Sequence, residues 1–333
     1  MVRSVLAAIV LALSTMTAAP AAGQQPFDFP RLPGPTIIAT HLTSDGETVW
    51  TTDHATFERL IAIDATGGIL YDKQIEGIVG PLKSAVFAGG SVWIPDLGGG
   101  VVHQVDAATG RQLVTIGNGR MHSHGVAVLD GSLWLSAYGD GSGDEVIRYD
   151  PVTGEEQARI QSPEPVYNLI AAGGYVWINR AYALARIDPA TNQIESGPAS
   201  EYEFEYDMWV GDGLLFAVTT DYPRKIAVID PASGTLVRII EPGVGFSDMA
   251  VTGGSLWGTF GDEVWQVDVA SGEVVTKYRD APHPLFIRIT GSVMWLINVD
   301  DASAHQVQWF AMPALDGGAP QAVPEKVKPQ KTK

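Results

Sequence analysis

The chain contains no cysteine, which excludes disulfide bonds, a lipid-anchor cysteine and covalently attached haem. It is also poor in basic residues, with 21 Lys and Arg against 38 Asp and Glu, so its formal net charge is −17. Because nucleic acids are bound largely through basic surfaces, this balance argues against a nucleic-acid partner. Charged residues make up only 18% of the chain and hydrophobic residues 45%, which is enough apolar material for a sizeable core.

The sequence also lacks the short motifs that mark common catalytic sites. No G-x-S-x-G, C-x-x-C, H-E-x-x-H or phosphate-binding glycine loop is present, so no nucleophile constellation indicates a hydrolase. What the chain has in abundance is glycine, with 37 residues, and proline, with 21. This composition predicts many tight turns.

The first 23 residues have the pattern of a secretory signal peptide. Arg3 precedes a short apolar stretch from Val5 to Leu13, and small residues follow up to Gly23. The apolar stretch is too short to cross a bilayer. We therefore expect residues 1–23 to be cleaved, with no membrane insertion, and the mature protein to be periplasmic or secreted. The Lys- and Pro-rich tail, residues 314–333, has no periodic apolar face, and we expect it to be disordered.

Between these ends the chain repeats itself with a period of about 40 residues. Each copy has an apolar run, a Gly-Gly or Asp-Gly turn, a short strand with a central aromatic residue and a further strand. In six copies a turn of the form D-x-x-T/S-G, or a close variant with Gly or Asn in the fourth or fifth place, follows. The seven aligned aromatic residues are Trp50, Trp93, Trp134, Trp177, Phe216, Trp257 and Trp295. The turn aspartates are Asp64, Asp106, Asp150, Asp188, Asp230 and Asp268.

Four short strands in each repeat are typical of a β-propeller blade. The sequence therefore predicts an all-β, single-domain, monomeric seven-bladed β-propeller of four-stranded antiparallel blades over residues 24–313. The aromatic residues are expected to pack between blades, and the aspartates to stabilise turns. The last repeat ends after its third strand, so we expect the segment from Phe27 to Ile38 to supply the missing strand and close the ring.

With seven copies of this frame, the chain resembles the YVTN-repeat and streptogramin (virginiamycin B) lyase-like seven-bladed propellers. Many relatives are binding or scaffold proteins, whereas the streptogramin lyases open a cyclic depsipeptide by metal-assisted elimination. Their site has a His at the start of one inner strand and an E-x-H pair in the next blade, near a magnesium ion. The resemblance places His283 at the first position and His41 in the next blade, without a Glu two residues before it.

In such propellers, ligands bind where the inner strands begin. Alignment of the repeats places Lys83, His124, Tyr167 and Tyr206 at equivalent positions on this face, and the next position inward holds Asp207 and Asp248. His122 lies two residues before His124, so both imidazoles would share one side of an extended segment. We interpret the pair as ligand-binding residues, as metal ligands together with Asp207 and Asp248, as catalytic residues, or as two solvated loop histidines.

Two further segments lie on the same face. The stretch from Glu201 to Asp207, "EYEFEYD", alternates acidic and aromatic residues, which would either contact a ring-bearing ligand or cap the core. The stretch from Gly139 to Glu145, "GDGSGDE", follows Tyr138 and is either a glycine-rich hairpin loop or a loop with calcium-binding oxygens. Asp221, Tyr222 and Asp262 belong to the other loops of this face.

These patterns favour an exported binding or interaction propeller. Its acidic, aromatic-rich face would recognise a small polar ligand or a protein partner and, as a further option, a divalent cation such as Mg²⁺ or Ca²⁺. The alternative is a metal-assisted C–O lyase that acts on a cyclic peptide or ester, as the family resemblance implies. In that case His124 or His283 would be the general base, and Asp207 or Asp248 would hold the cation.

Overall fold

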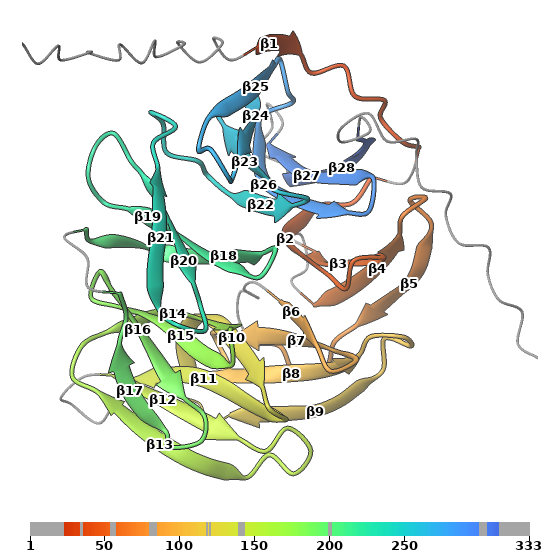
Figure 1. Ribbon diagram of the computed structural model, residues 1–333. Helices are drawn as coiled ribbons and strands as arrows, with labels where there is room; N and C mark the ends of the chain where they lie inside the picture. The colour runs from red at the N-terminus through yellow and green to blue at the C-terminus, as the bar shows by residue number, and fades with distance from the viewer. Residues whose placement is uncertain are drawn as a thin grey trace, which may run out of the picture.

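The computed structural model describes residues 23–33, 36–53, 58–79, 85–117, 119, 121–138, 144–198, 202–299 and 305–312. Within these ranges, the side chains of Thr40, Asp53, Met121, His122, Ser123, His124 and Tyr138 lie outside the description. The predicted signal peptide up to residue 22 and the predicted tail 314–333 lie outside it as well. The regular elements of the described ranges are all strands, and they form seven sheets arranged in a ring (Figure 1).

The seven sheets follow one another along the chain as the blades of a propeller, with the innermost strand of each blade first. Blade 1 contains β2 (Ala39–Ser44), β3 (Thr48–Asp53), β4 (Arg59–Asp64) and β5 (Ile69–Gln74). Blade 2 contains β6 (Val86–Ala88), β7 (Ser91–Asp96), β8 (Val101–Asp106) and β9 (Gln112–Gly117). Blade 3 contains β10 (Met121–Leu129), β11 (Ser132–Tyr138), β12 (Asp144–Tyr149) and β13 (Glu156–Ser162).

The second half of the ring has the same plan. Blade 4 contains β14 (Val166–Ala172), β15 (Tyr175–Arg180), β16 (Ala183–Asp188) and β17 (Gln193–Ser196). Blade 5 contains β18 (Phe204–Gly211), β19 (Leu214–Thr219), β20 (Ile226–Asp230) and β21 (Thr235–Ile240). Blade 6 contains β22 (Met249–Thr252), β23 (Ser255–Phe260), β24 (Glu263–Asp268) and β25 (Val274–Arg279), and blade 7 contains β26 (Pro284–Thr290), β27 (Val293–Val299) and β28 (His305–Ala311).

The N-terminal segment closes the ring, as the incomplete last repeat predicts. Arg31 and Ile38 form antiparallel bridges with β28, and the Leu32 amide donates a hydrogen bond to the Trp309 carbonyl at 2.9 Å. The ring of Phe27 packs against that of Phe310, and the ring of Phe29 packs against that of Tyr278. One feature has no counterpart in the predicted frame: β1 (Gly23–Pro26) adds a fifth, parallel strand to the outer edge of β25.

The hydrophobic core is divided among the interfaces between neighbouring blades. The seven aligned aromatic residues are at most 2% exposed, and each belongs to a cluster with apolar side chains of an adjacent blade. Their predicted packing role is confirmed. Since one twisted sheet cannot bury both of its faces alone, each blade depends on its two neighbours.

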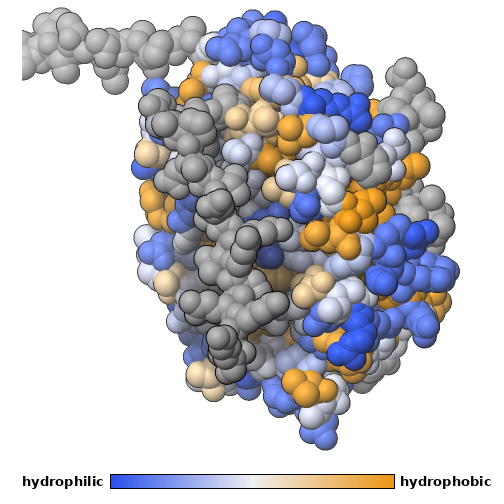
Figure 2. Space-filling model, turned by 90° about the vertical axis from the view of Figure 1, so that its right-hand side faces the viewer, coloured by the Kyte–Doolittle hydropathy of each residue, from blue (hydrophilic) through white to orange (hydrophobic). Residues whose placement is uncertain are grey.

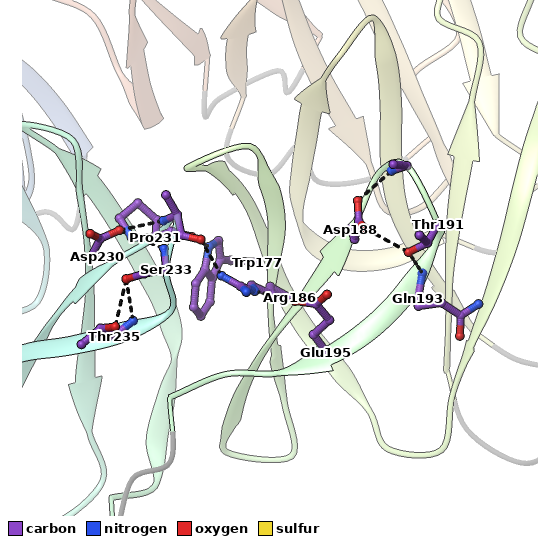
Figure 3. Close-up of polar contacts among 12 residues, drawn as sticks. Trp177, Arg186, Asp188, Thr191, Gln193, Glu195, Asp230, Pro231, Ser233 and Thr235 are labelled. Atoms are coloured by element: carbon purple, nitrogen blue, oxygen red, sulfur yellow. Dashed lines mark hydrogen bonds and ion pairs between the residues drawn. The ribbon is translucent and has the colours of Figure 1, made fainter.

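The aspartate turns stabilise the outer end of blades 1 to 6 in the predicted way, as the turns of Asp188 and Asp230 illustrate (Figure 3). In blade 5, the Asp230 carboxylate accepts hydrogen bonds from the Ala232 and Ser233 amides. The turn also joins two blades, because the indole of Trp177 donates to the Pro231 carbonyl at 3.2 Å and Arg186 donates to the Ala232 carbonyl. These carboxylates therefore have structural roles, remote from the channel.

The surface around the ring is mixed in character. Seen from the side, hydrophobic residues form separate patches among hydrophilic ones (Figure 2), and outer strands β5 and β9 carry the exposed residues Leu70 and Leu113. No helix within the described residues has the length and apolar character needed to cross a bilayer.

Candidate binding face

We use the name entry face for the end of the ring at which the seven inner strands begin. In an antiparallel blade the second strand returns to the end where the first began, so the loops between second and third strands share this face with the loops that enter the inner strands. The remaining turns, including all of the aspartate turns, lie at the opposite end. This geometry places the described backbone of the predicted site residues at one end of the ring.

Most of the inner strands are irregular at the entry face. The strand register shifts between Ala39 and Leu42 in β2, Met121 and Val126 in β10, Val166 and Asn168 in β14, Phe204 and Met208 in β18, and Pro284 and Phe286 in β26. Such bulges bend a strand and change the direction of its side chains. The predicted residues His122, His124, Tyr167, Tyr206 and Asp207 all fall within these shifts.

Four of the predicted site residues have side chains outside the described part of the structure. Residues 80–84, which include Lys83, are not described, and only the backbone is described for His122, His124 and Tyr138. The backbone near His124 is nevertheless informative. A Cβ atom on Gly125 would lie 2.1 Å from Asn168 Oδ1 and 2.6 Å from the Leu169 amide, so β10 approaches β14 more closely than any larger residue permits.

Tyr167, Tyr182 and Tyr206 form a cluster that we call the tyrosine platform. The ring centroids of Tyr167 and Tyr206 are 4.3 Å apart, and those of Tyr182 and Tyr206 are 5.6 Å apart. The hydroxyl oxygens of Tyr182 and Tyr206 are 3.0 Å apart. This hydrogen bond, with burial and nearby negative charge, raises the pKa of Tyr206 to about 12, so the phenol is neutral at physiological pH.

Tyr182 is a platform member that the repeat pattern does not reveal. It lies in the short turn between β15 and β16, where Ala181 and Tyr182 have φ values of 45° and 69°. Residues other than glycine seldom adopt this left-handed backbone conformation. The Phe204 amide donates to the Tyr182 carbonyl at 2.8 Å, which ties the turn to blade 5 and holds the ring beside Tyr206.

Asp207 follows Tyr206 in the same bulge and faces the channel mouth. Its carboxylate accepts one hydrogen bond from Asn168, at 3.4 Å, and no cation among the described residues forms an ion pair with it. The side chain is exposed to solvent, although neighbouring groups surround part of the carboxylate. Partial desolvation raises its pKa and the negative charges of Asp248 and Glu205 raise it further, while the Arg288 cation partly opposes the shift.

Asp248 is buried and has several hydrogen-bond donors from its own chain. Its oxygens accept hydrogen bonds from Trp209 Nε1 at 2.6 Å, the Ile287 amide at 2.9 Å and Arg288 Nη1 at 2.6 Å. These donors come from blades 5 and 7, so the carboxylate links three consecutive blades. A divalent cation at Asp248 would have to compete with Arg288 for the same oxygens.

The two histidines that the family resemblance implicates lie near the seam between blades 7 and 1. His283 is exposed at the start of β26, has a φ of 47°, and accepts a hydrogen bond from the Val299 amide through its carbonyl. The His41 ring centroid lies 5.0 Å from that of Phe286. The described residues include no group of three or more His, Asp or Glu side chains arranged to hold a metal ion.

The acidic loop between β11 and β12 is described only at its end. Asp144 accepts a hydrogen bond from the Val166 amide of blade 4 at 2.9 Å, and Glu145 accepts one from Gln161 at 2.7 Å and pairs with Arg159. Asp140 and Ser142 lie outside the described residues. Asp144 therefore links blades 3 and 4, whereas Glu145 joins β12 to β13 within blade 3.

The exposed aromatic side chains are concentrated on this face. Among the described residues, the large aromatic side chains classed as exposed are Tyr182, Tyr206, Tyr222 and Phe260. All four lie at the entry face, on the adjacent blades 4, 5 and 6. Phe260 was not predicted, although it is the last residue of β23, three residues after Trp257, and the second strand of every blade ends at this face.

The architecture defines this chain as a seven-bladed β-propeller. A family model described as outer membrane protein assembly factor BamB matches residues 98–237. Among solved structures, BamB from Moraxella catarrhalis is similar at 14% identity with a TM-score of 0.53, over 83% of this chain and 84% of that one. The computationally designed Ika8 protein is similar at 13% identity with a TM-score of 0.57, over 85% and 98% of the two chains.

No curated protein matches the chain. At these identities, the structural similarities establish the fold and leave function open. The resemblance to streptogramin lyases stays a hypothesis.

Proposed function

We propose that this protein is an exported interaction propeller that binds a protein partner through the aromatic part of its entry face on blades 4–6. The concentration of every exposed large aromatic side chain of the described residues on these three blades carries the proposal. Tyrosine and phenylalanine are enriched in protein interfaces because they bury much area at a small cost in side-chain entropy. The family model that matches residues 98–237 is described as an outer membrane protein assembly factor. This match supports a role in protein interaction.

Site-specific photocrosslinking tests this proposal. A benzoylphenylalanine at Tyr222, which is 92% exposed on the entry face, is compared with one at Val152, which is 83% exposed at the opposite end. In envelope extracts we expect a discrete adduct from position 222 that excess wild-type protein suppresses. A matched set of adducts from both positions, or adducts that wild-type protein does not suppress, would contradict the proposal.

A variant pair separates the face from general surface hydrophobicity. Tyr206→Ala, Tyr222→Ala and Phe260→Ala together remove the aromatic surface, whereas Leu70→Ala, Val152→Ala and Val237→Ala remove exposed apolar side chains elsewhere. Exposed substitutions of this kind change stability little. Each triple variant replaces the wild-type protein as the excess competitor in the crosslinking experiment. We expect the first variant to fail to suppress the adduct and the second variant to suppress it as the wild type does.

A further inference from the structure

Several aromatic rings on the neighbouring blades have a cation of the chain above them. Arg186 Cζ lies 3.9 Å from the ring centroid of Tyr175, and Lys277 Nζ lies 3.5 Å from that of Trp265. Such pairs are attractive because the ring face is electronegative. Among the described residues, no Lys or Arg lies above any ring of the tyrosine platform, although the platform is partly exposed.

The carboxylates beside the platform also differ in whether a cation of the chain pairs with them. Glu205 pairs with Arg224, and Asp248 pairs with Arg288. Asp207, which lies between them in the channel mouth, has only the Asn168 amide as a described polar partner. The site therefore has a net negative charge next to a cluster of three aromatic rings, of which Tyr182 and Tyr206 are stacked.

We propose that the partner inserts an arginine side chain at the channel mouth, with its guanidinium against the tyrosine platform and paired with Asp207. This inference rests on the proposed function and specifies the chemistry of the partner. Arginine fits better than lysine because its planar guanidinium stacks on aromatic rings and binds a carboxylate with two parallel hydrogen bonds. The acidic charge of the whole chain, −17, attracts a basic segment over a longer range.

The physical state of Asp207 supports this arrangement. Partial desolvation and the carboxylates of Asp248 and Glu205 raise its pKa. Arg288 and the Asn168 amide only partly oppose this shift, so the ionised form is disfavoured in the free protein. A bound guanidinium would favour the ionised form and lower that pKa. Binding should therefore weaken as the pH falls and Asp207 becomes protonated.

Titration calorimetry with defined peptides tests the inference without knowledge of the natural partner. The probe is acetyl-(Gly-Arg)₄-amide, and the control is acetyl-(Gly-citrulline)₄-amide, which has nearly the same shape and no charge. We expect the arginine peptide to bind the full mature chain at least about tenfold more tightly than the citrulline peptide. Equal binding of both peptides would overturn the inference.

Substitutions separate local recognition from general attraction to an acidic protein. Asp207→Asn and Tyr206→Ala should each weaken arginine-peptide binding, the first by about tenfold. Asp130→Asn is the matched control, since it removes the same charge from an exposed turn at the opposite end, where φ is 49° and asparagine is well tolerated. Equal effects of Asp207→Asn and Asp130→Asn would mean that only net charge attracts the peptide, and would overturn the inference.

The outcomes also distinguish the two proposals. Thermal melting of each variant shows whether a loss of binding reflects unfolding. If the crosslinked adduct at Tyr222 is found but the arginine peptide does not bind, the interaction face stands and the arginine inference fails. If neither is observed, both proposals fail.

Discussion

Asp248 and Arg288 form an ion pair, with Oδ2 and Nη1 2.6 Å apart, that joins the start of blade 6 to the inner strand of blade 7. The other carboxylate oxygen accepts a hydrogen bond from the indole of Trp209 in blade 5. A single side chain thus links three inner strands at the entry face. The link matters for function because it holds the blades that carry the exposed aromatic residues.

We predict that Asp248→Ala destabilises the protein by about 3 kcal/mol, because it leaves the Arg288 cation and the Trp209 indole without their acceptor. Asp248→Asn keeps one neutral acceptor and should cost less. Urea denaturation measures both effects. Asp262→Ala, an exposed acidic residue on the same face, is the control, and an equally small loss for Asp248→Ala and Asp262→Ala would contradict the prediction.

We predict that Asp207→Asn raises the melting temperature at neutral pH. The pKa of Asp207 is raised in the folded state, so its ionised form disfavours folding at any pH above that pKa. As the pH falls through the folded pKa, the carboxyl becomes neutral in the native state and the advantage of the variant should disappear. Melting curves from pH 7 to pH 4 measure this. A variant that melts below the wild type at pH 7 would contradict it.

We predict that buried His103 makes the protein less stable in mild acid. Burial lowers its pKa below the ordinary value of 6.5, although Asp96, 3.6 Å away, partly opposes the shift. The unfolded chain therefore gains a proton at a higher pH than the native state, and stability is lost as the pH falls below about 6.5. His103→Gln keeps hydrogen bonds to its neighbours, Thr115 Oγ1 among them, and has no titratable group there.

The measurement for His103 is the urea midpoint of the wild type and of His103→Gln at pH 7.5 and pH 5. The wild type should lose more stability than the variant over this range. The turn carboxylates of Asp106 and Asp230 have lowered pKa values because they accept hydrogen bonds, so their contribution is lost only at more acidic pH. Parallel losses in the wild type and the variant would contradict the prediction.

We predict that loss of the N-terminal closure is strongly destabilising. Deletion of residues 27–38 removes the hydrogen bonds to β28 and the aromatic contacts of Phe27 and Phe29. Phe29→Ala alone should cost about 3 kcal/mol, because the ring is buried between blades 6 and 7. Differential scanning calorimetry checks both changes, with exposed Phe260→Ala as a control, and unchanged melting after the deletion would contradict the closure.

The repeat frame made the ring predictable because each blade needs the same aromatic residue, turn and strand order. Closure followed from the missing fourth strand of the last repeat. The parallel pairing of β1 could not be predicted, because "GQQP" has no apolar pattern and its partner lies more than 250 residues away. Contacts of this kind depend on where the finished ring places its edges.

The candidate site was predictable in position and only partly in composition. Alignment of the repeats placed Tyr167, Tyr206 and Asp207 at one mouth, and the structure brings the two tyrosines into contact. The alignment could not show that Tyr182 joins them, since two residues with left-handed backbone conformation position that ring. The alignment also could not show that Arg288 approaches Asp248 from the next blade. The binding roles of Tyr167, Tyr206, Asp207 and Asp248 stay predictions, as do those of Lys83, His122, His124, Tyr138 and His283.

The hydrogen bonds between Leu32 and Trp309 have a consequence for the order of folding. They join residues near opposite ends of the chain, whereas each blade pairs strands that are close in sequence. Local hairpins form quickly, and contacts between distant residues form slowly because the intervening chain must first be ordered. The ring can therefore close only after the last blade has formed, and until then the first and seventh blades present open edges to other chains.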